Sequence, residues 1–320
     1  MGMTMRKVLR IGTRASLLAL TQSTWIKKQI EALYPQTQVD LVSISTKGDR
    51  ILDVPLAKIG GKGLFVKEIE DALLDETVDI AVHSMKDVPT VLPTGLHIGI
   101  VPPREIPQDA FIANRFSSLA ELPLGAAVGT SSLRRQSQLA LLRPDLRITA
   151  LRGNVDTRLR KLDEGVYDAI ILAGAGLKRL GMAHRITALL DTDQMLPAIG
   201  QGSLAIELRC KDTELLEALQ SLHHAPTALA VAAERAFLLR LEGGCQVPIG
   251  AHATVLEDQV RLTGLIASVD GSQCVKDTMT APSSQATELG VQLAESLLRK
   301  GGKAILDAIY NKDVSAGIRP

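Results

Sequence analysis

The sequence has 320 residues, which is enough for two or three domains with buried cores. Its 46% hydrophobic and 22% charged residues are ordinary for a soluble protein, and its 2% aromatic residues argue against a stacking surface for bases or sugars. The net charge of +1 gives no reason to expect nucleic acid or a membrane as a partner.

The first third of the chain alternates strands and helices. We expect a strand over 8–13 and a helix over 14–34, with Ser16 as its N-cap and Leu18, Trp25 and Leu33 on one face. A strand over 38–45 follows, and then a helix over 63–75 in which Phe65, Ile69 and Leu73 are four residues apart. The apolar strand over 79–84 leads into the polar loop MKDVPT.

The middle third repeats this order. Strands are expected over 126–130, 147–151 and 168–174, with helices over 131–143 and 155–165 between them. Pro144 ends the first helix, while Asn154 caps the second and Gly165 ends it. This alternation predicts parallel-type α/β sheets.

From about Thr227 the pattern changes to a small α+β domain. A helix precedes three strands, over 248–256, 259–268 and 274–280, and another helix covers 286–300. Segments 101–107 and 195–202 are rich in Pro and Gly and could carry the chain twice between domains, inserting one α/β domain into another.

Four strand-to-helix junctions carry arginine. A helix N-terminus offers free N–H groups and a positive dipole end, so such junctions favour anions. The residues at the four junctions are Arg14 with Ser16; Thr130, Ser131 and Ser132 with Arg134 and Arg135; Arg152 with Arg158; and Arg179. The junction with Arg134 and Arg135, taken alone, is equally compatible with an ordinary cap and solvated arginines, and that alternative fits Arg152 less well. Four such junctions together predict an anionic ligand, and guanidinium groups suit carboxylates or phosphates.

Lys86 and Asp87 directly follow a buried strand. Asp87 is either a salt-bridge partner or the carboxylate that stabilises positive charge in an otherwise anion-binding site. His83, His223 and His224 could assist a cysteine nucleophile, although the His223–His224 pair is more typical of a surface.

The three cysteines, at 210, 245 and 274, have neither CxxC nor metal-ligand spacing. Their sparse, odd number suits a reducing compartment, and no apolar stretch has signal-peptide or membrane-span length, so we expect a cytoplasmic protein without a metal. Cys245 lies between a Gly-Gly pair and Gln-Val-Pro, after the end of a helix whose dipole disfavours a thiolate. This setting favours a permanent covalent anchor over a turnover nucleophile.

These segments together resemble the hydroxymethylbilane synthase (porphobilinogen deaminase) family nearly from end to end. The resemblance is carried by LRIGTRASLLAL, PLAKIGGKGLFVKEIEDALL, DIAVHSMKDVPT, GTSSLRRQSQLA, LRGNVDTRL, DAIILAGAGLKRLG, LPAIGQG and RLEGGCQVPIGA. It implies an α/β fold of two periplasmic-binding-protein-like domains around a cleft plus a small α+β C-terminal domain. The implied boundaries are 1–102 with 198–222, then 103–197, then 223–320.

The resemblance also implies the chemistry. A dipyrromethane cofactor would be attached to Cys245 by a thioether, and four porphobilinogens would be added head to tail with loss of ammonia. Water would then release the linear hydroxymethylbilane from a protein that acts as a monomer.

The resemblance further assigns roles to individual residues. The cofactor would be held by Lys86, Asp87, Thr130, Ser132, Arg134 and Arg135; the substrate or growing chain would be held by Arg14, Ser16, Phe65, Arg152, Arg158, Arg179 and Gln201. Asp87 would stabilise the cationic intermediate, with Arg14, Arg152 and Lys86 also in the catalytic set, and segment 58–65 would lie over the cleft. Two other classes stay open, a non-catalytic carboxylate-binding receptor with two lobes and a cysteine-dependent acyl transferase or amidohydrolase.

Overall fold

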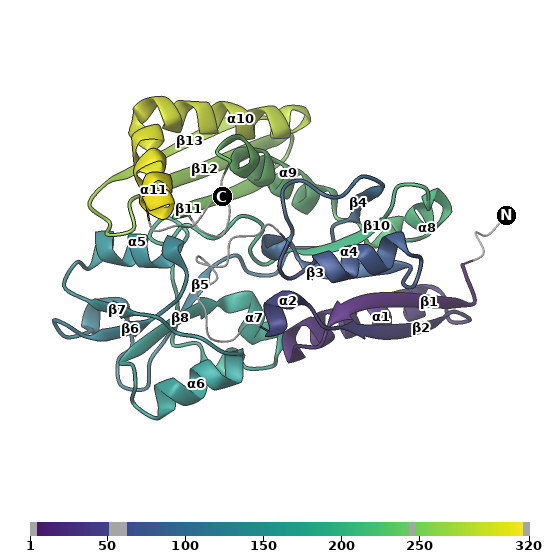
Figure 1. Ribbon diagram of the computed structural model, residues 1–320, viewed down its shortest axis with the longest axis horizontal. Helices are drawn as coiled ribbons and strands as arrows, with labels where there is room; N and C mark the ends of the chain where they lie inside the picture. Colours follow the sequence, from purple (N-terminus) through teal and green to yellow (C-terminus); the bar gives the residue numbers. More distant parts are fainter. Residues whose placement is uncertain (1–4, 51–62, 243–246, 316–320) are drawn as a thin grey trace. The chain divides into compact units, whose positions relative to one another are not determined.

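The computed structural model describes residues 5–50, 63–242 and 247–315, which fall in two compact units (Figure 1). Unit 1 contains the described residues of 5–50, 63–105 and 203–228, and unit 2 contains those of 106–202 and 229–315. The chain leaves unit 1 between Glu105 and Ile106 and returns between Gly202 and Ser203. These two crossings lie in or at the end of the two segments rich in Pro and Gly, and the chain passes to unit 2 again between Ala228 and Leu229. The three-domain boundaries stay a prediction.

Unit 1 is built on a five-stranded sheet with the order β2-β1-β3-β10-β4. Its strands are β1 (Val8–Arg14), β2 (Gln38–Ile44), β3 (Ile80–Ser84), β4 (Leu96–Ile100) and β10 (Leu204–Arg209). β1 runs parallel to β2 and β3, but β10 runs antiparallel to both β3 and β4. The expectation of parallel-type sheets is therefore wrong for β10, because that strand enters only after the long excursion through unit 2 and not through a single crossover helix.

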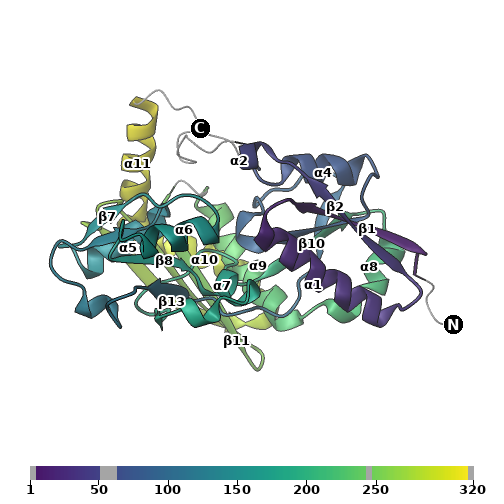
Figure 2. The same ribbon diagram turned by 90° about the horizontal axis from the view of Figure 1, so that it is seen from below.

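Two helices cover opposite faces of this sheet (Figure 2). Helix α1 (Leu17–Leu33) packs on the face that carries Ile80 and Val82, and α4 (Lys67–Leu74) packs on the face that carries Ala81. This division follows from the two-residue period of β3. The short helices α2 (Lys47–Arg50) and α8 (Thr213–Ala218) complete the unit.

The buried face of α1 differs from the predicted one. Ser16 caps the helix as predicted, its hydroxyl accepting the Ala19 N–H at 3.3 Å. The fully buried residues are Gln22, Ser23, Ile26 and Ile30, whereas Trp25 and Leu33 are 43% and 45% exposed. The predicted face of Leu18, Trp25 and Leu33 is therefore not the buried one, because two polar side chains occupy the buried stripe, where they are satisfied by hydrogen bonds.

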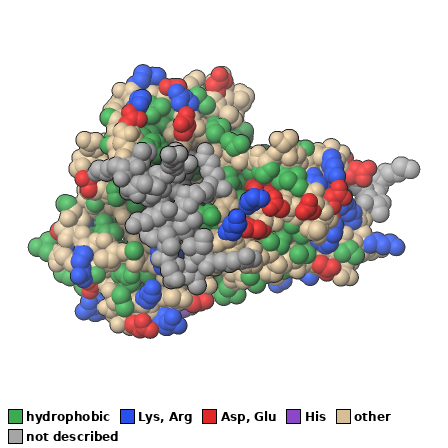
Figure 3. Space-filling view, in the orientation of Figure 1, with side chains coloured by type: hydrophobic (Ala, Val, Ile, Leu, Met, Phe, Trp, Pro, Cys, Tyr) green, Lys and Arg blue, Asp and Glu red, His purple; other side chains and the backbone are tan. Residues whose placement is uncertain are grey.

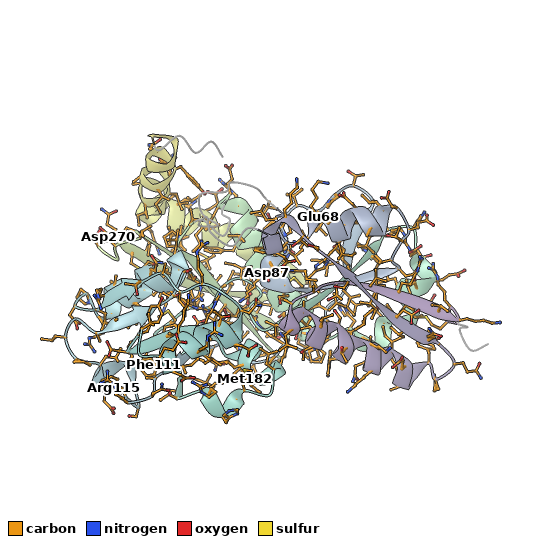
Figure 4. The ribbon with its side chains drawn as sticks, turned by 60° about the horizontal axis from the view of Figure 1, so that its bottom comes forward. Glu68, Asp87, Phe111, Arg115, Met182 and Asp270 are labelled. Carbon is orange, nitrogen blue, oxygen red and sulfur yellow. The ribbon has the colours of Figure 1, made fainter. Side chains whose placement is uncertain are left out.

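Unit 2 contains a second five-stranded sheet with the order β7-β6-β8-β5-β9. Its strands are β5 (Asp109–Ile112), β6 (Ala127–Gly129), β7 (Arg147–Thr149), β8 (Ala169–Ala173) and β9 (Ala188–Leu189), and its helices are α5 (Leu133–Leu142), α6 (Val155–Asp163) and α7 (Gly174–Arg179). Phe111 is fully buried in its core (Figure 4). β5 pairs antiparallel with β8 and β9, so this sheet is mixed as well.

Unit 2 also contains a three-stranded antiparallel sheet of β11 (Ile249–Leu256), β12 (Gln259–Ala267) and β13 (Cys274–Pro282). The helices α9 (Ala225–Arg240, of which residues from Leu229 lie in this unit), α10 (Ala286–Leu297) and α11 (Lys303–Ser315) accompany it. The core joins Phe237 of α9, Leu293 of α10 and Leu262 of β12. The predicted fold class, two α/β lobes with a small α+β domain, is confirmed.

Candidate functional site

A pocket in unit 1 brings together four of the residues predicted for the site. It is lined by Arg14, Ser16, Phe65 and Asp87, together with Gln22 and Ser84. Arg14 is the last residue of β1, and Ser16 caps the helix that follows. The sequence analysis placed Arg14 and Ser16 at one strand end and Asp87 after another, and the parallel pairing of β1 with β3 brings these ends to one edge of the sheet.

Asp87 is positioned by a turn at the end of β3. The turn Met85–Asp87 is a single 3-10 turn, closed by the Val88 N–H donating to the Met85 carbonyl at 3.2 Å. The Met85 N–H donates to the Ser203 carbonyl at 3.0 Å, and its side chain is buried. Asp87 is half-buried at this position (Figure 4), whereas Lys86 is exposed.

Arg14 has a carboxylate partner that the sequence did not reveal. Its Nε lies 3.1 Å from Asp49 Oδ1, and its Nη2 also donates to that oxygen. The guanidinium carbon lies 4.3 Å from the centre of the Phe65 ring, which is within the range of a cation–π interaction. Asp49 follows a Thr-Lys-Gly turn, and no periodicity in that stretch marked it as a site residue.

Gln22 and Ser84 are further pocket residues that the sequence analysis missed. The Gln22 Nε2 donates to Ser84 Oγ at 3.0 Å, which ties α1 to the end of β3. Gln22 is only 3% exposed. Gln22 lies four residues after Leu18 and four before Ile26, so a polar residue in an apolar helical stripe is the sequence signal that could have identified it.

Behind β3 lies a buried group of ionisable side chains. His83 Nε2 lies 3.0 Å from Glu207 Oε2, with both side chains almost fully buried. Burial, and next the negative charge of Glu207, raise the pKa of nearby Glu70 to about 7. His83 is thus engaged with Glu207 and is not a surface residue.

In unit 2, Arg134 and Arg135 share one buried carboxylate, that of Asp109. Arg135 Nε and Nη2 lie 3.0 and 2.8 Å from Asp109 Oδ1, and Arg134 Nη1 lies 2.8 Å from Oδ2. Arg134 Nη1 also donates to the Leu196 carbonyl at 2.6 Å, and Arg135 Nη1 donates to the Ile171 carbonyl at 3.1 Å. Asp109, the first residue of β5, was not predicted as a site residue.

Two further arginines of unit 2, Arg152 and Arg158, lie in the surroundings of Arg135. Burial, followed by the positive charges of Arg135 and Arg152, lowers the pKa of Arg158 to about 10. Arg158 Nε donates to the Gly153 carbonyl at 2.7 Å, next to the turn that separates β7 from α6. The predicted residues at these two junctions therefore lie close enough to repel one another.

The other predicted residues of unit 2 lie at the ends of its elements. Thr130 is buried after β6, its hydroxyl accepting the Ser132 N–H at 3.3 Å, and Ser132 is the N-cap residue of α5. Gln201 Nε2 donates to Asp109 Oδ1 at 2.9 Å, and Arg179 Nη2 donates to the Gly202 carbonyl at 2.7 Å. Gln201 thus belongs to the same network as Arg135.

Several predictions fall on residues outside the described part. Cys245, Gly243 and Gly244 lie there, and of segment 58–65 the structure describes only Gly63–Phe65. Within residues 5–50, 63–242 and 247–315, no group of His, Cys, Asp and Glu could hold a metal ion. In the same ranges, no helix combines the length and the apolar character that a membrane crossing needs.

The donor set of unit 2 fits an anionic group. Arg135 and Arg152 lie close enough to Arg158 to lower its pKa, after the larger effect of burial, and the buried Arg134 Nε has no hydrogen-bond partner among the described residues. Such a set is stabilised by bound carboxylates. On the face drawn in Figure 3, basic and acidic side chains intermix.

Comparisons with known proteins identify the family of this chain. Residues 9–217 match the family model described as "Porphobilinogen deaminase, dipyromethane cofactor binding domain", and residues 228–299 match "Porphobilinogen deaminase, C-terminal domain". A porphobilinogen deaminase of Syntrophotalea carbinolica is 59% identical over 94% of this chain and 96% of its own, and one of Trichlorobacter lovleyi is 57% identical over 97% and 99%.

Solved structures resemble the chain more distantly. A periplasmic substrate-binding protein of an ABC transporter from Coxiella burnetii has 15% identity and a TM-score of 0.42, covering 71% of this chain and 96% of its own. The methionine-binding protein MetQ has 14% identity and the same TM-score, covering 68% and 88%. The two family models and the full-length relatives show that this chain belongs to the porphobilinogen deaminase family.

Proposed function

We propose that the protein joins four molecules of porphobilinogen head to tail and releases linear hydroxymethylbilane and four molecules of ammonia, with one water consumed. The observation that carries this proposal is the pocket of unit 1, in which Asp87 lies with Arg14 and Ser16 in a chain of this family. One carboxylate among anion-binding groups suits a substrate that has carboxylates and becomes positively charged during reaction.

The role of Asp87 follows from the charge that develops. The carbon–nitrogen bond breaks in the protonated aminomethyl group, so the bonding electrons leave with the nitrogen as neutral ammonia while the pyrrole nitrogen donates electrons into the ring. The positive charge of the ammonium group therefore moves onto the substrate ring and its nitrogen. A fixed carboxylate beside that nitrogen stabilises the transition state more than the ground state, in which the charge is on the amine, and this raises the turnover rate.

The arginines are proposed to hold carboxylates. Arg14 and Ser16 would bind the acetate or propionate of an incoming substrate, with Phe65 against its ring. Arg152, Arg158, Arg179 and Gln201 would hold the growing chain. Guanidinium groups suit this task because they bind carboxylates through paired hydrogen bonds and keep their charge.

A dipyrromethane, when bound, supplies a free pyrrole α-carbon to which the first substrate unit is joined. Cys245 is proposed as its covalent anchor, and Lys86, Thr130, Ser132, Arg134 and Arg135 as groups that neutralise or hydrogen-bond its carboxylates. Asp87 would also face its pyrrole N–H groups. We further propose that the protein acts as a monomer in the cytoplasm.

Intact-mass measurement with product analysis tests this function. The purified protein should be heavier than its sequence by one dipyrromethane, and it should release four molecules of ammonia for each linear tetrapyrrole formed. Cys245→Ser should lose the added mass and the activity, while Cys210→Ser, which changes an exposed cysteine, should keep both. An active protein with the bare sequence mass would contradict the covalent anchor, and a loaded protein without product would contradict the activity.

A further inference from the structure

The pocket of unit 1 contains an arginine that is already oriented by the protein. Arg14 Nε lies 3.1 and 3.4 Å from the two carboxylate oxygens of Asp49, and its Nη2 donates to one of them. Nη1 takes no part in this fork. The Asp49 side chain therefore holds one edge of the guanidinium plane and leaves the other edge outside the ion pair.

Asp49 is itself held in place from the opposite side. Its Oδ2 accepts the Thr46 hydroxyl at 2.7 Å and the Thr46 N–H at 3.3 Å, and Thr46 is fully buried. Burial acts to raise the pKa of Asp49, but the hydrogen bonds from Arg14 and Thr46 outweigh it and the net pKa is lowered. The carboxylate is therefore charged at neutral pH.

A third segment fixes the plane of the guanidinium. The Phe65 ring lies against Arg14, and the Gly48 N–H donates to the Leu64 carbonyl at 2.8 Å. A Cβ atom at position 48 would lie 2.3 Å from the Phe65 ring, so glycine is needed there for this close approach. The end of β1, the helix α2 and the residues before α4 thus converge on one side chain.

We propose that Asp49 is a positioning residue for substrate binding, which fixes Arg14 so that the free edge of its guanidinium meets a carboxylate of the incoming pyrrole. This inference rests on the proposed function. Asp49 is not a competitor that the substrate displaces, because displacement would leave a half-buried carboxylate bound to Thr46 without its cation, at a cost in free energy. Asp49 instead stays in place, and Arg14 binds the Asp49 carboxylate on one edge and a substrate carboxylate on the other.

The variant Asp49→Asn tests the proposal, because asparagine keeps the size of the side chain and an acceptor for Thr46 but loses the charge. We expect the KM for porphobilinogen to rise about tenfold, as for loss of one oriented charged hydrogen bond, with kcat within roughly twofold. The dissociation constant of a pyrrole with the same acetate and propionate but no aminomethyl group, measured by calorimetry on loaded enzyme, should rise equally.

A double variant identifies Arg14 as the residue through which Asp49 acts. Arg14→Lys removes the fork, so adding Asp49→Asn to it should leave the KM and the dissociation constant of the non-reacting pyrrole unchanged. Asp71→Asn, which breaks the exposed Lys67–Asp71 pair on α4, is the matched control and should leave both constants at wild-type values.

Three results would overturn the inference. Tighter binding by Asp49→Asn would make Asp49 a competitor, unchanged binding constants with a lower melting temperature would make it a structural residue only, and additive effects in the double variant would mean that it acts without Arg14. If Asp49→Asn does not fold, Asp49→Glu, which keeps the charge but shifts the fork by a methylene, must raise the KM without lowering kcat. A wild-type protein that forms no product would instead contradict the proposed function.

Discussion

Asp109 is a fully buried carboxylate that two adjacent arginines share. Burial by itself raises the pKa of such a group, but the positive charges of Arg134 and Arg135 outweigh it and hold the pKa of Asp109 well below its ordinary range. Replacing the carboxylate would leave two buried guanidinium groups without a counter-charge. Asp109 therefore controls how much positive charge this part of unit 2 carries.

Asp109→Asn should lower the free energy of unfolding by about 3–5 kcal/mol, as expected when one partner of a buried ion pair is removed. Urea unfolding at neutral pH measures the loss. Asp307→Asn, which breaks the exposed Lys303–Asp307 pair, is the control and should change stability by less than about 1 kcal/mol. Equal effects of the two substitutions would contradict the role given to Asp109.

Asp87→Ala should slow addition of the first substrate by roughly a hundredfold to a thousandfold, as expected for loss of one preorganised electrostatic contact. Binding should persist, because the substrate carboxylates still meet Arg14. Asp87→Glu should keep the charge and turn over slowly. Single-turnover kinetics on cofactor-loaded protein measure the step, and addition at close to the wild-type rate by Asp87→Ala would reduce Asp87 to a salt-bridge partner.

At the scale of residues, the sequence predicted the cations but not their carboxylates. The sequence identified Arg14, Arg134 and Arg135 because arginine at a strand-to-helix junction indicates an anion-binding site. Asp49 and Asp109 lie about 35 and 25 residues away along the chain and only tertiary pairing brings them close. Local patterns carry no information about such partners.

Helix α4 shows how an element places a charge next to a sheet. Its buried side carries Ile69 and Leu73, as the four-residue spacing predicted, but also Glu70. Glu70 faces Glu207 of β10 and His83 of β3, with Asp71 and Lys67 nearby on its own helix. Glu70 is 5% exposed, and its raised pKa means that folding favours its protonated form.

This arrangement predicts a pH-dependent stability. The folded pKa of Glu70 is about 7 against 4.5 for the unfolded chain, so between these values the folded state binds the extra proton. The Glu70 contribution is fully present below pH 4.5 and is lost as pH rises through 7. Glu70→Gln should therefore gain stability relative to wild type as pH increases from 5 to 8, by a few kcal/mol at most.

Thermal unfolding across this pH range measures the difference. Glu288→Gln, at an exposed position in the first turn of α10, should instead follow the wild-type curve in parallel. If the melting temperature of Glu70→Gln changes with pH in parallel with that of wild type, Glu70 is ionised in the folded protein and the proposed protonation is wrong.

Helices and strands with a regular hydrophobic period were predicted well, whereas a strand whose pairing partners are far away in the sequence was not. α5, α6 and the three strands β11–β13 lie where caps, stops and alternation placed them. β10 is buried along its whole length between β3 and β4, so it shows no alternation, and its partners lie about 110 to 120 residues earlier. Trp25 lies on the exposed side of α1, and hydrophobicity alone cannot show this because the polar Gln22 occupies the buried stripe.

At the scale of the whole molecule, the α/β class and two of the chain crossings could be read from the sequence. Pro and Gly mark segments 101–107 and 195–202, which contain the crossing at Glu105–Ile106 and end at the crossing at Gly202–Ser203, whereas the crossing at Ala228–Leu229 lies inside helix α9 and has no such mark. The mixed direction of the sheets could not be read in this way. A chain that leaves a sheet for about 100 residues can return to it in either direction, and the choice depends on tertiary packing.

A group of neighbouring arginines in unit 2 predicts how loss of the bound cofactor should affect the protein. Besides burial, the positive charges of Arg135 and Arg152 lower the pKa of Arg158, which means that these two cations disfavour the charge on Arg158 in the folded state. A covalently held anionic group would relieve that repulsion and stabilise the state it fits. Cys245→Ser should therefore melt at a lower temperature than wild type, whereas Cys210→Ser should not.

Salt separates this electrostatic cause from lost packing. The screening length falls from about 10 Å at 0.1 M to 3 Å at 1 M salt, so sodium chloride should raise the melting temperature of Cys245→Ser more than that of wild type. Removing one of the like charges should act in the same direction, and Arg158→Gln added to Cys245→Ser should raise the melting temperature at low salt. Differential scanning calorimetry at several salt concentrations measures both effects. If the difference between Cys245→Ser and wild type does not change with salt, and Arg158→Gln lowers the melting temperature further, repulsion among these arginines is not what the bound group relieves.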